Sequence, residues 1–392
     1  MPIPVNKPVI CPVLIGRAGN TASLHQLIEK AHSGAGQVAL ICGEAGVGKS
    51  RLVSEIQTYA TGQGFLLFQG NCFPTDLSYP YAPLLDLLRT FLTNHSSEKI
   101  TAALGPSASA LYPLLPDIIT SVPPSPITAP SEPEQEKRRL FAALAQFFIS
   151  KAAKHPLLLV VEDLHWSDES SLEFLHYLAR RSAVQPLALL VTYRDDEIHP
   201  TLRRWLAQLD RERLAQEFSL ARLTQVEVAA MLRAIFPAGS FIQKDLQDSI
   251  YALTEGNPFF IEEVLKSLIS SGDIVYADGA EKRRSPGELH VPRSIQDAVQ
   301  QRSEHLAETA RHVLLLAAVA GRRFDFTLLQ QLTGHDEQQL LQVMKELMAA
   351  QLVVEESAEQ FAFLHALTRE AMYGQLLARE RKALHKTIAE TM

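Results

Sequence analysis

The chain has 392 residues, of which 46% are apolar and 21% charged, an ordinary composition for a globular protein and enough length for two or three domains. Its formal net charge of −7 gives no general attraction to nucleic acid or anionic membranes, and no apolar run reaches the length of a membrane span. The three cysteines (Cys11, Cys42 and Cys72) have neither metal-ligand spacing nor the even number of a disulfide framework. They predict a reducing compartment, and we expect a cytoplasmic protein without a membrane partner.

The segment from residue 37 to residue 60 reads QVALICGEAGVGKSRLVSEIQTYA, an apolar strand followed by a glycine-rich turn and a helical pattern. The turn has the G-x-x-x-x-G-K-S/T pattern, in which successive backbone N–H groups point at one phosphate chain. In such a loop the lysine reaches the β- and γ-phosphates, the serine hydroxyl ligates Mg²⁺, and the helix adds its positive N-terminal end. The predicted nucleotide-binding residues are Gly43, Glu44, Ala45, Gly46, Val47, Gly48, Lys49, Ser50 and Arg51.

Five short apolar runs separated by helical patterns predict an α/β fold, a parallel sheet with helices on both faces. The runs are Val38–Cys42, Phe65–Phe68, Leu157–Val161, Leu187–Thr192 and Phe218–Leu220. Between the second and third runs, proline density predicts a mobile surface insertion at about residues 104–133. Residues 1–221 are therefore predicted to form one nucleotide-binding domain.

Beyond about residue 222 the strands are predicted to stop. Three segments, residues 223–236, 244–256 and 257–272, carry apolar residues at three- and four-residue spacing, which predicts an all-helical lid domain over residues 222–290. The stretch from residue 279 to residue 290 is polar and is expected to be a connector. Residues 291–392 add amphipathic helices and two strand-like pieces, Leu352–Glu355 and Gln360–Phe363, a pattern that predicts a winged-helix domain.

Two adjacent carboxylates, Glu162 and Asp163, follow the buried run Leu157–Val161. The carboxyl end of a parallel strand is where open sheets bind ligands, so one carboxylate can hold Mg²⁺ and the other can orient or deprotonate the attacking water. By position we assign Glu162 to the metal and Asp163 to the water, although adjacent carboxylates can exchange these roles. Farther along the same segment, Asp168 is expected to cap a helix and Trp166 to be a packing anchor.

Arg194 ends the run that begins at Leu187. If that strand lies between the phosphate-loop strand and the carboxylate strand, the guanidinium faces the γ-phosphate and senses bound ATP. The alternative is a surface arginine paired with Asp195 or Asp196, because ion pairs at strand ends are frequent.

Ten blocks in order along the chain resemble the STAND class of AAA-like signal-transducing ATPases, in the bacterial branch found in large LuxR-type transcriptional regulators and in some multidomain adenylate cyclases and kinases. The blocks are LIGR, GEAGVGKS, YPYAPLLDLL, PLLLVVEDLHWSD, LLVTYRDDE, LTQVEVAAML, EGNPFFIEEVL, VPRSIQDAVQQR, AVAGRRFDF and FAFLHALTREAMY. The resemblance implies ATP and ADP as the nucleotides, with slow hydrolysis of ATP that resets a switch.

The resemblance also implies contacts outside the phosphate loop. The segment Leu14, Ile15, Gly16 and Arg17 is similar to the hinge on which related ATPases lay the adenine, through backbone groups of the two apolar residues. Pro258, in the GNP turn, is implied to touch the base or ribose, and His365 to lie near the β-phosphate of ADP. For His365 the alternative is a core histidine. The sequence departs from the family at Ala18 and Asn20, where acidic residues are usual, and at Glu162, where many relatives have aspartate.

The expected function is an ATP-dependent switch, closed with ADP and open with ATP, that self-associates in the ATP state and answers an unknown inducer. Family members usually continue into a helical-repeat sensor and a DNA-binding domain, so we expect transcription control through parts beyond this chain. The alternatives are a regulatory module of a signalling enzyme and a DNA-loading ATPase of the replication-initiator type. Residues 291–392 carry 11 Lys and Arg against 13 Asp and Glu, which argues against direct DNA binding.

Overall fold

The computed structural model describes residues 10–92, 133–236, 244–270, 306–350 and 352–391, with short pieces at 111, 114, 274–277, 280–283, 292, 296–297, 299–300 and 303. The chain divides into two compact units. The N-terminal unit is Arg17–Ala221, and the C-terminal unit combines Met1–Gly16 with Arg222–Met392. The predicted insertion at residues 104–133 lies outside the described residues, apart from Leu111, Leu114 and Pro133.

The N-terminal unit is an α/β layer structure around a five-stranded parallel sheet with the strand order β2-β3-β4-β1-β5. Its strands are β1 (Gln37–Cys42), β2 (Leu66–Asn71), β3 (Leu157–Glu162), β4 (Leu187–Tyr193) and β5 (Gln216–Ser219). Its helices are α1 (Ala18–His32), α2 (Lys49–Gly62), α3 (Ala82–Leu92), α6 (Pro133–Ala152), α7 (Glu169–Arg181) and α8 (Pro200–Arg211), with short 3₁₀ turns η1 (Pro74–Ser78) and η4 (Leu164–Trp166). All five predicted strands are confirmed, with ends that differ by at most three residues.

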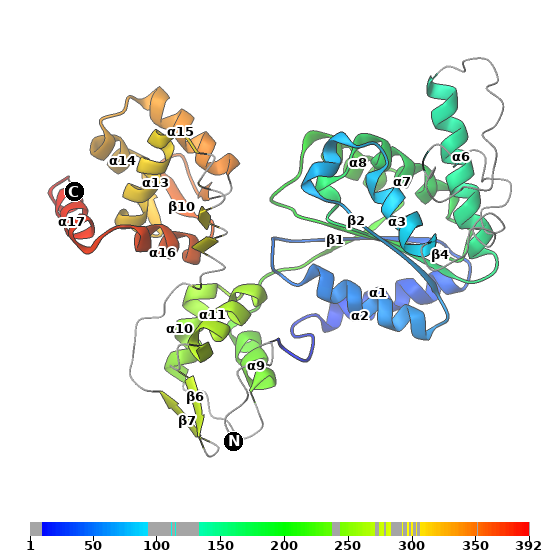
Figure 1. Ribbon diagram of the computed structural model, residues 1–392, viewed down its shortest axis with the longest axis horizontal. Coiled ribbons are helices and arrows are strands. Elements are labelled where there is room, and N and C mark those ends of the chain that lie inside the picture. Colours follow the sequence, from blue (N-terminus) through cyan, green and yellow to red (C-terminus); the bar gives the residue numbers. More distant parts are fainter. Residues whose placement is uncertain are drawn as a thin grey trace. The chain divides into compact units, whose positions relative to one another are not determined.

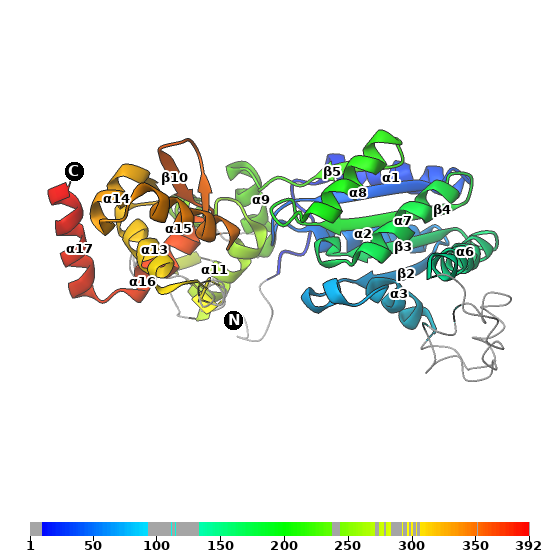
Figure 2. The same ribbon diagram turned by 90° about the horizontal axis from the view of Figure 1, so that it is seen from above.

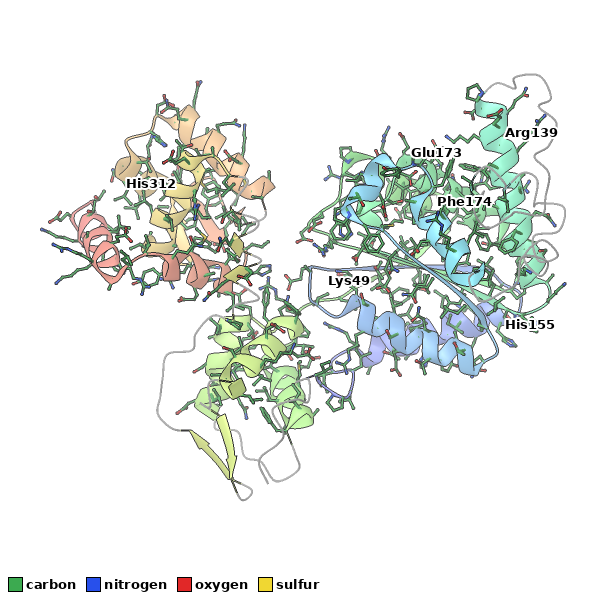
Figure 3. The ribbon with its side chains drawn as sticks, in the orientation of Figure 1. Lys49, Arg139, His155, Glu173, Phe174 and His312 are labelled. Carbon is green, nitrogen blue, oxygen red and sulfur yellow. The ribbon has the colours of Figure 1, made fainter. Side chains whose placement is uncertain are left out.

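Helices cover both faces of this sheet, with α1 and α2 on one side and α7 and α8 on the other (Figure 1). β3 and β4 are buried at every position, which is why their sequences are continuous apolar runs rather than alternating ones. Alternate residues of β1, β3 and β4 pack against α6, α7 and α8 in the main core. In that core Phe174 of α7, labelled in Figure 3, meets Phe141 of α6 edge to face at 5.5 Å.

The C-terminal unit is mainly helical. In its first part it contains α9 (Gln225–Ile235), α10 (Lys244–Thr254), α11 (Pro258–Ser270), β6 (Ile274–Ala277) and β7 (Ala280–Arg283). The second part contains α13 (Glu308–Ala320), β8 (Arg323–Asp325), α14 (Phe326–Thr333), α15 (Glu337–Ala349), β9 (Val353–Glu355), β10 (Gln360–Phe363), α16 (Ala366–Gln375) and α17 (Ala378–Thr391). The last helix, α17, lies beside α13 and α14, as Figures 1 and 2 show from two directions.

Within the second part, β8, β10 and β9 form a small antiparallel sheet in that order. The two predicted strand-like pieces are confirmed as β9 and β10. Their apolar residues join those of α13 to α16 in one core, against which Leu253 and Phe260 of the first part also pack. The first part has its own core of α9, α10 and α11, which also buries Cys11.

The prediction of an all-helical segment up to residue 290 is wrong, because β6 and β7 form an antiparallel pair there. Ile274–Val275–Tyr276 is rich in β-formers, and the two residues between the strands are Asp278 and Gly279, a dipeptide favoured in two-residue hairpin loops. Part of the predicted connector, Ala280–Arg283, is therefore a strand. In the described part of the chain, no helix is long and apolar enough to cross a membrane.

Candidate active site

The predicted phosphate loop joins β1 directly to α2, as the sequence indicated. Its three glycines have positive φ angles of 148° at Gly43, 80° at Gly46 and 104° at Gly48, a region that L side chains rarely adopt. A Cβ at Gly43 would also lie only 2.8 Å from the backbone oxygen of Leu220. The loop conformation therefore requires glycine at these places, and it ends with Gly48 as the N-terminal cap of α2.

Lys49 is the first residue of α2 and is only 7% exposed (Figure 3). Its Nζ donates hydrogen bonds to the backbone oxygens of Gly43 at 2.7 Å and Glu44 at 2.9 Å, so the ammonium is folded onto its own loop. Burial lowers the pKa of Lys49, and the nearby Arg194 charge lowers it further. A phosphate chain on this loop would supply the negative charge that such a desolvated ammonium lacks.

The side chain of Arg17 holds the end of the phosphate loop by hydrogen bonds. This buried guanidinium donates through Nη2 to the backbone oxygen of Val47 at 3.2 Å and to that of Ala221, the last residue of the N-terminal unit, at 2.6 Å. Sequence reasoning assigned Arg17 only to an adenine hinge and missed this structural role. The other hinge residues belong to the C-terminal unit, where Ile15 packs against the core of α9 to α11.

Gly16 adopts a positive φ of 69° beside Glu227, so the hinge segment turns sharply before Arg17. Its contact with adenine, and that of Leu14 and Ile15, stay predictions.

The two carboxylates after the β3 run are oriented by different neighbours. Glu162, buried at the end of β3, accepts a hydrogen bond from Nε2 of Gln69 at 3.0 Å, and the amide oxygen of Gln69 accepts one from Gln57 of α2 at 3.0 Å. Asp163 has a left-handed backbone with φ of 58°, and its N–H donates to Oγ1 of Thr192 at 3.0 Å.

Burial raises the pKa of the Asp163 carboxyl, while the charges of Arg194 and Lys49 oppose the rise. The Asp163 carboxylate therefore lies within the field of both cations, which are the groups predicted to meet the terminal phosphates.

Arg194 follows β4, and β4 lies between β1 and β3 as predicted. The guanidinium pairs with Glu197 at 2.6 Å rather than with Asp195 or Asp196, and it lies over the ring of Trp166 at 4.9 Å. The ion pair and the aromatic ring hold Arg194 at the carboxyl edge of the sheet. Contact with a γ-phosphate stays a prediction.

His165 is a buried residue at this edge that sequence reasoning missed. Its ring lies 4.4 Å from the Trp166 ring, and its Nε2 is 3.4 Å from Oε2 of Glu197. Burial, with the nearby charges of Arg194 and Lys49, lowers the pKa of His165 to about 3. The imidazole is therefore neutral at physiological pH. The sequence signal that could have identified His165 is its position two residues after Asp163.

Asp168 caps α7 as predicted, because its Oδ1 accepts the N–H of Ser171 at 3.0 Å.

Ser50, on the first turn of α2, is exposed, which suits a metal-ligating hydroxyl. Among the described residues, no group of three His, Cys, Asp or Glu side chains is arranged to hold a metal ion.

Pro258 and His365 belong to the C-terminal unit. Pro258 begins α11 shortly after Glu255 and Gly256, which have positive φ angles of 53° and 80°. A Cβ at Gly256 would lie 1.9 Å from the Leu223 backbone oxygen, so glycine is required there. Asn257 is fully buried, and its side-chain oxygen accepts the N–H of Phe259. The GNP sequence thus builds a rigid turn, whose nucleotide contact stays a prediction.

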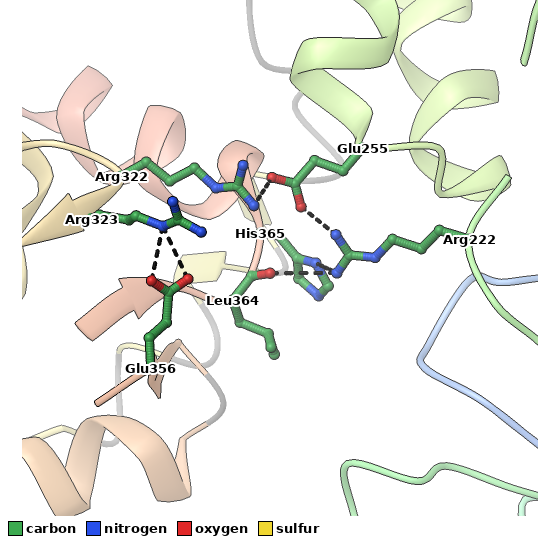
Figure 4. A network of polar contacts seen from close by, with 7 residues as sticks. All are labelled: Arg222, Glu255, Arg322, Arg323, Glu356, Leu364 and His365. Carbon is green, nitrogen blue, oxygen red and sulfur yellow. Dashed lines mark hydrogen bonds and ion pairs between the residues drawn. The ribbon is translucent and has the colours of Figure 1, made fainter. Parts of the chain in front are cut away.

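His365 is buried at the start of α16, with Phe260 edge-on to its ring at 5.3 Å. Nη2 of Arg222 lies 2.8 Å from its Nδ1 and donates to it, while Nη1 of Arg222 pairs with Glu255 (Figure 4). Glu255 also pairs with Arg322, so one carboxylate joins residues from three segments of the unit. Sequence reasoning missed this network of Arg222, Glu255, Arg322 and His365, because its members are more than 30 residues apart.

Residues 13–191 match the family model of the AAA ATPase domain. The matched segment contains the phosphate loop and both carboxylates. The fold is similar to that of a Walker-type ATPase of Pyrococcus abyssi, with a TM-score of 0.53 and 14% identity over 94% of this chain and 98% of that one.

The chain is also similar to parts of two longer proteins. A STAND protein with a tetratricopeptide repeat sensor from Pyrococcus horikoshii aligns over 98% of this chain and 47% of its own, with 12% identity and a TM-score of 0.41. An uncharacterized protein of Rhizobium meliloti (strain 1021) is 27% identical over 395 residues, which cover 96% of this chain. The match takes in 36% of that protein, so the chain spans about a third of its curated relative.

Proposed function

We propose that this chain is an ATP-binding and ATP-hydrolysing molecular switch, closed with ADP and open with ATP. The observation that carries the proposal is the convergence of Lys49, Asp163 and Arg194 at the carboxyl edge of one parallel sheet, beside a phosphate loop in an AAA ATPase domain. Lys49 and Arg194 provide positive charge where the transferred phosphoryl group would lie. Asp163 provides a carboxylate within their field.

In the proposed reaction the loop N–H groups and Lys49 bind the phosphate chain, and Arg194 faces the γ-phosphate. Ser50 and Glu162 would hold Mg²⁺, which neutralises charge on the β- and γ-phosphates when it is bound. Asp163 orients a water molecule and accepts its proton as the water oxygen attacks the γ-phosphorus. The bond from that phosphorus to the bridging oxygen breaks, and ADP and inorganic phosphate are the products. Exchange of the roles of Glu162 and Asp163 remains the alternative.

We further propose that residues 291–392 form a winged helix that reaches ADP through His365, while Pro258 contacts the base or ribose. The order helix, strand, two helices and two strands from α13 to β10, with β8, β10 and β9 in one sheet, supports the winged-helix assignment. The Arg222, Glu255, Arg322 and His365 network supports a role in switching. It joins the turn before Pro258 to the segment that carries His365, so ion pairs and a hydrogen bond couple the positions of these two segments.

The physiological output that we propose is transcription control through domains outside this chain, with an unidentified inducer as the input. Self-association in the ATP state would transmit the signal. The charge balance of residues 291–392 argues against contacts with the phosphates of duplex DNA, so the chain itself is expected not to bind it.

The test is to compare the purified protein with Mg-ADP and with a non-hydrolysable Mg-ATP analogue. We expect slow hydrolysis of ATP, a monomer with ADP, and a larger species with the analogue in analytical ultracentrifugation. Lys49→Ala is expected to show neither hydrolysis nor nucleotide-dependent association. Hydrolysis with the same sedimentation in both nucleotides would leave an ATPase but exclude the switch. If the wild type shows neither hydrolysis of ATP nor nucleotide-dependent association, the proposed function is excluded altogether.

A further inference from the structure

Asp163 has a backbone conformation that is unusual for a residue other than glycine. Its φ of 58° lies in the left-handed region, where non-glycine residues are uncommon and persist only if the surroundings hold them. The residue before it, Glu162, is the last of β3, and the β3–β4 ladder ends one residue earlier at the pair Val161 and Val191. The chain therefore turns out of the sheet at Asp163.

The group that meets this turn is the hydroxyl of Thr192, which is 1% exposed on β4. The Asp163 N–H has left the ladder, and it donates to Thr192 Oγ1 at 3.0 Å. Without that acceptor the N–H would lose this hydrogen bond at a partly buried position, and backbone amides away from water are rarely left unpaired. Thr192 itself stays fixed, because the backbone of β4 pairs with β1 at Ile41.

The turn also determines what the Asp163 carboxylate faces. Glu162, which continues the strand, directs its carboxylate to Gln69 on β2. Asp163, one residue later and in the left-handed conformation, has its carboxyl within the field of Arg194 and Lys49. The φ angle of residue 163 sets the direction of its Cα–Cβ bond, so a different backbone conformation would redirect the carboxylate.

We propose that Thr192 is a positioning residue for Asp163, whose hydroxyl holds the left-handed turn that keeps the carboxylate beside Lys49 and Arg194 during hydrolysis. This inference rests on the proposed function of the site. Thr192 acts through the backbone of Asp163, and its side chain takes no part in proton transfer.

The test compares Thr192→Val, which keeps the shape and removes the acceptor, with Thr192→Ser, which keeps the hydroxyl. We expect Thr192→Val to lower kcat for Mg-ATP about tenfold, which corresponds to about 1.4 kcal/mol, and to leave the ATP dissociation constant within about twofold. Thr192→Ser should restore most of kcat. In an Asp163→Asn background, Thr192→Val should cause little further loss, because both changes act through the same carboxylate.

Hydrogen exchange at the Asp163 amide gives a readout that does not need turnover. We expect protection in the wild type and in Thr192→Ser, and faster exchange in Thr192→Val with unchanged exchange at the β3 amides. Equal protection in all three proteins would overturn the proposal, and so would a Thr192→Ser variant as impaired as Thr192→Val. If the wild type hydrolyses no ATP, the proposed function fails, while the exchange experiment still decides whether Thr192 holds Asp163.

Discussion

The carboxyl edge of the sheet in the N-terminal unit and the Arg222, Glu255, Arg322 and His365 network in the C-terminal unit hold their charges in different ways. At the sheet edge, glycines with positive φ and backbone acceptors fix Lys49, while the side chains of Gln69 and Thr192 hold the two acidic residues by hydrogen bonds. In the network, side chains that are 12%, 27% and 54% exposed at Glu255, Arg222 and Arg322 meet in ion pairs.

This difference bears on what each region can do. A site fixed by backbone geometry and by hydrogen bonds within one sheet is organised before its ligand arrives. Partly exposed ion pairs between separate segments are individually weak and exchange at low cost. The first arrangement suits binding and chemistry, and the second suits a contact that forms in one state of a switch and opens in another.

The largest effect is expected at Lys49. Lys49→Ala removes a charge-assisted donor to the phosphates and should weaken ATP binding at least about 100-fold in titration calorimetry. Lys30→Ala, on the exposed end of α1 in the same unit, is the matched control and should bind ATP normally. An unchanged affinity in Lys49→Ala would contradict the phosphate-loop assignment.

The two carboxylates should separate in their effects. Asp163→Asn should keep Mg-ATP bound and lower kcat about 10²- to 10⁴-fold, because the water loses its base. Glu162→Gln should instead raise the Mg²⁺ concentration needed for half-maximal hydrolysis at least about tenfold. Steady-state rates across a magnesium series measure both. The opposite pattern would show that Glu162 activates water and Asp163 binds the metal.

His365→Ala should weaken ADP binding about tenfold, because one hydrogen bond to a charged phosphate is lost, with little change in the melting of the ligand-free protein. Arg222→Gln is the matched control, since it removes the Arg222–His365 contact but keeps the imidazole. Nucleotide exchange followed with a fluorescent ADP analogue distinguishes them. Equal losses in both variants would mean that His365 acts through Arg222 and not on the nucleotide.

His165 should make the stability of the N-terminal unit depend on pH. Its pKa is about 3 when folded and has the ordinary value of 6.5 when unfolded, so between these values the unfolded chain binds an extra proton. Stability should therefore be complete above pH 6.5 and fall as the pH drops below it. Urea unfolding should show about 1 kcal/mol more loss between pH 6.5 and 5.5 in the wild type than in His165→Gln. If the free energy of unfolding depends on pH equally in both proteins, the His165 imidazole is hydrated in the folded protein.

The smallest effect is expected at Glu255. Glu255→Gln keeps the shape and removes two ion pairs, and it should lower the free energy of unfolding by about 1 kcal/mol or less at low salt. The difference from the wild type should shrink in 0.5 M NaCl, because salt screens partly exposed charges. A loss of several kcal/mol in the free energy of unfolding, independent of salt, would mean that the network is a rigid part of the fold. It would argue against a switching role.

Most of the N-terminal unit was predictable from local patterns. Continuous apolar runs need burial on both faces, and only a parallel sheet covered by helices provides it, so the strands and the place of the phosphate loop followed from the residues themselves. The position of β4 between β1 and β3 was also expected, and with it the place of Arg194 at the same edge as the carboxylates. The β6–β7 pair was missed because helical periodicity before it hid a short β-forming stretch.

The sequence by itself determined where the candidate residues lie: the G-x-x-x-x-G-K-S pattern specifies the turn between β1 and α2, and two acids that follow a buried parallel strand lie at its carboxyl end. Only the tertiary structure decided how these groups are held. Arg17 reaches Val47, Gln69 reaches Glu162, Thr192 reaches Asp163, and Arg222 reaches both Glu255 and His365. Each of these contacts joins residues from 29 to 143 positions apart, and no local pattern specifies which distant side chain will complete a hydrogen bond when the elements pack together.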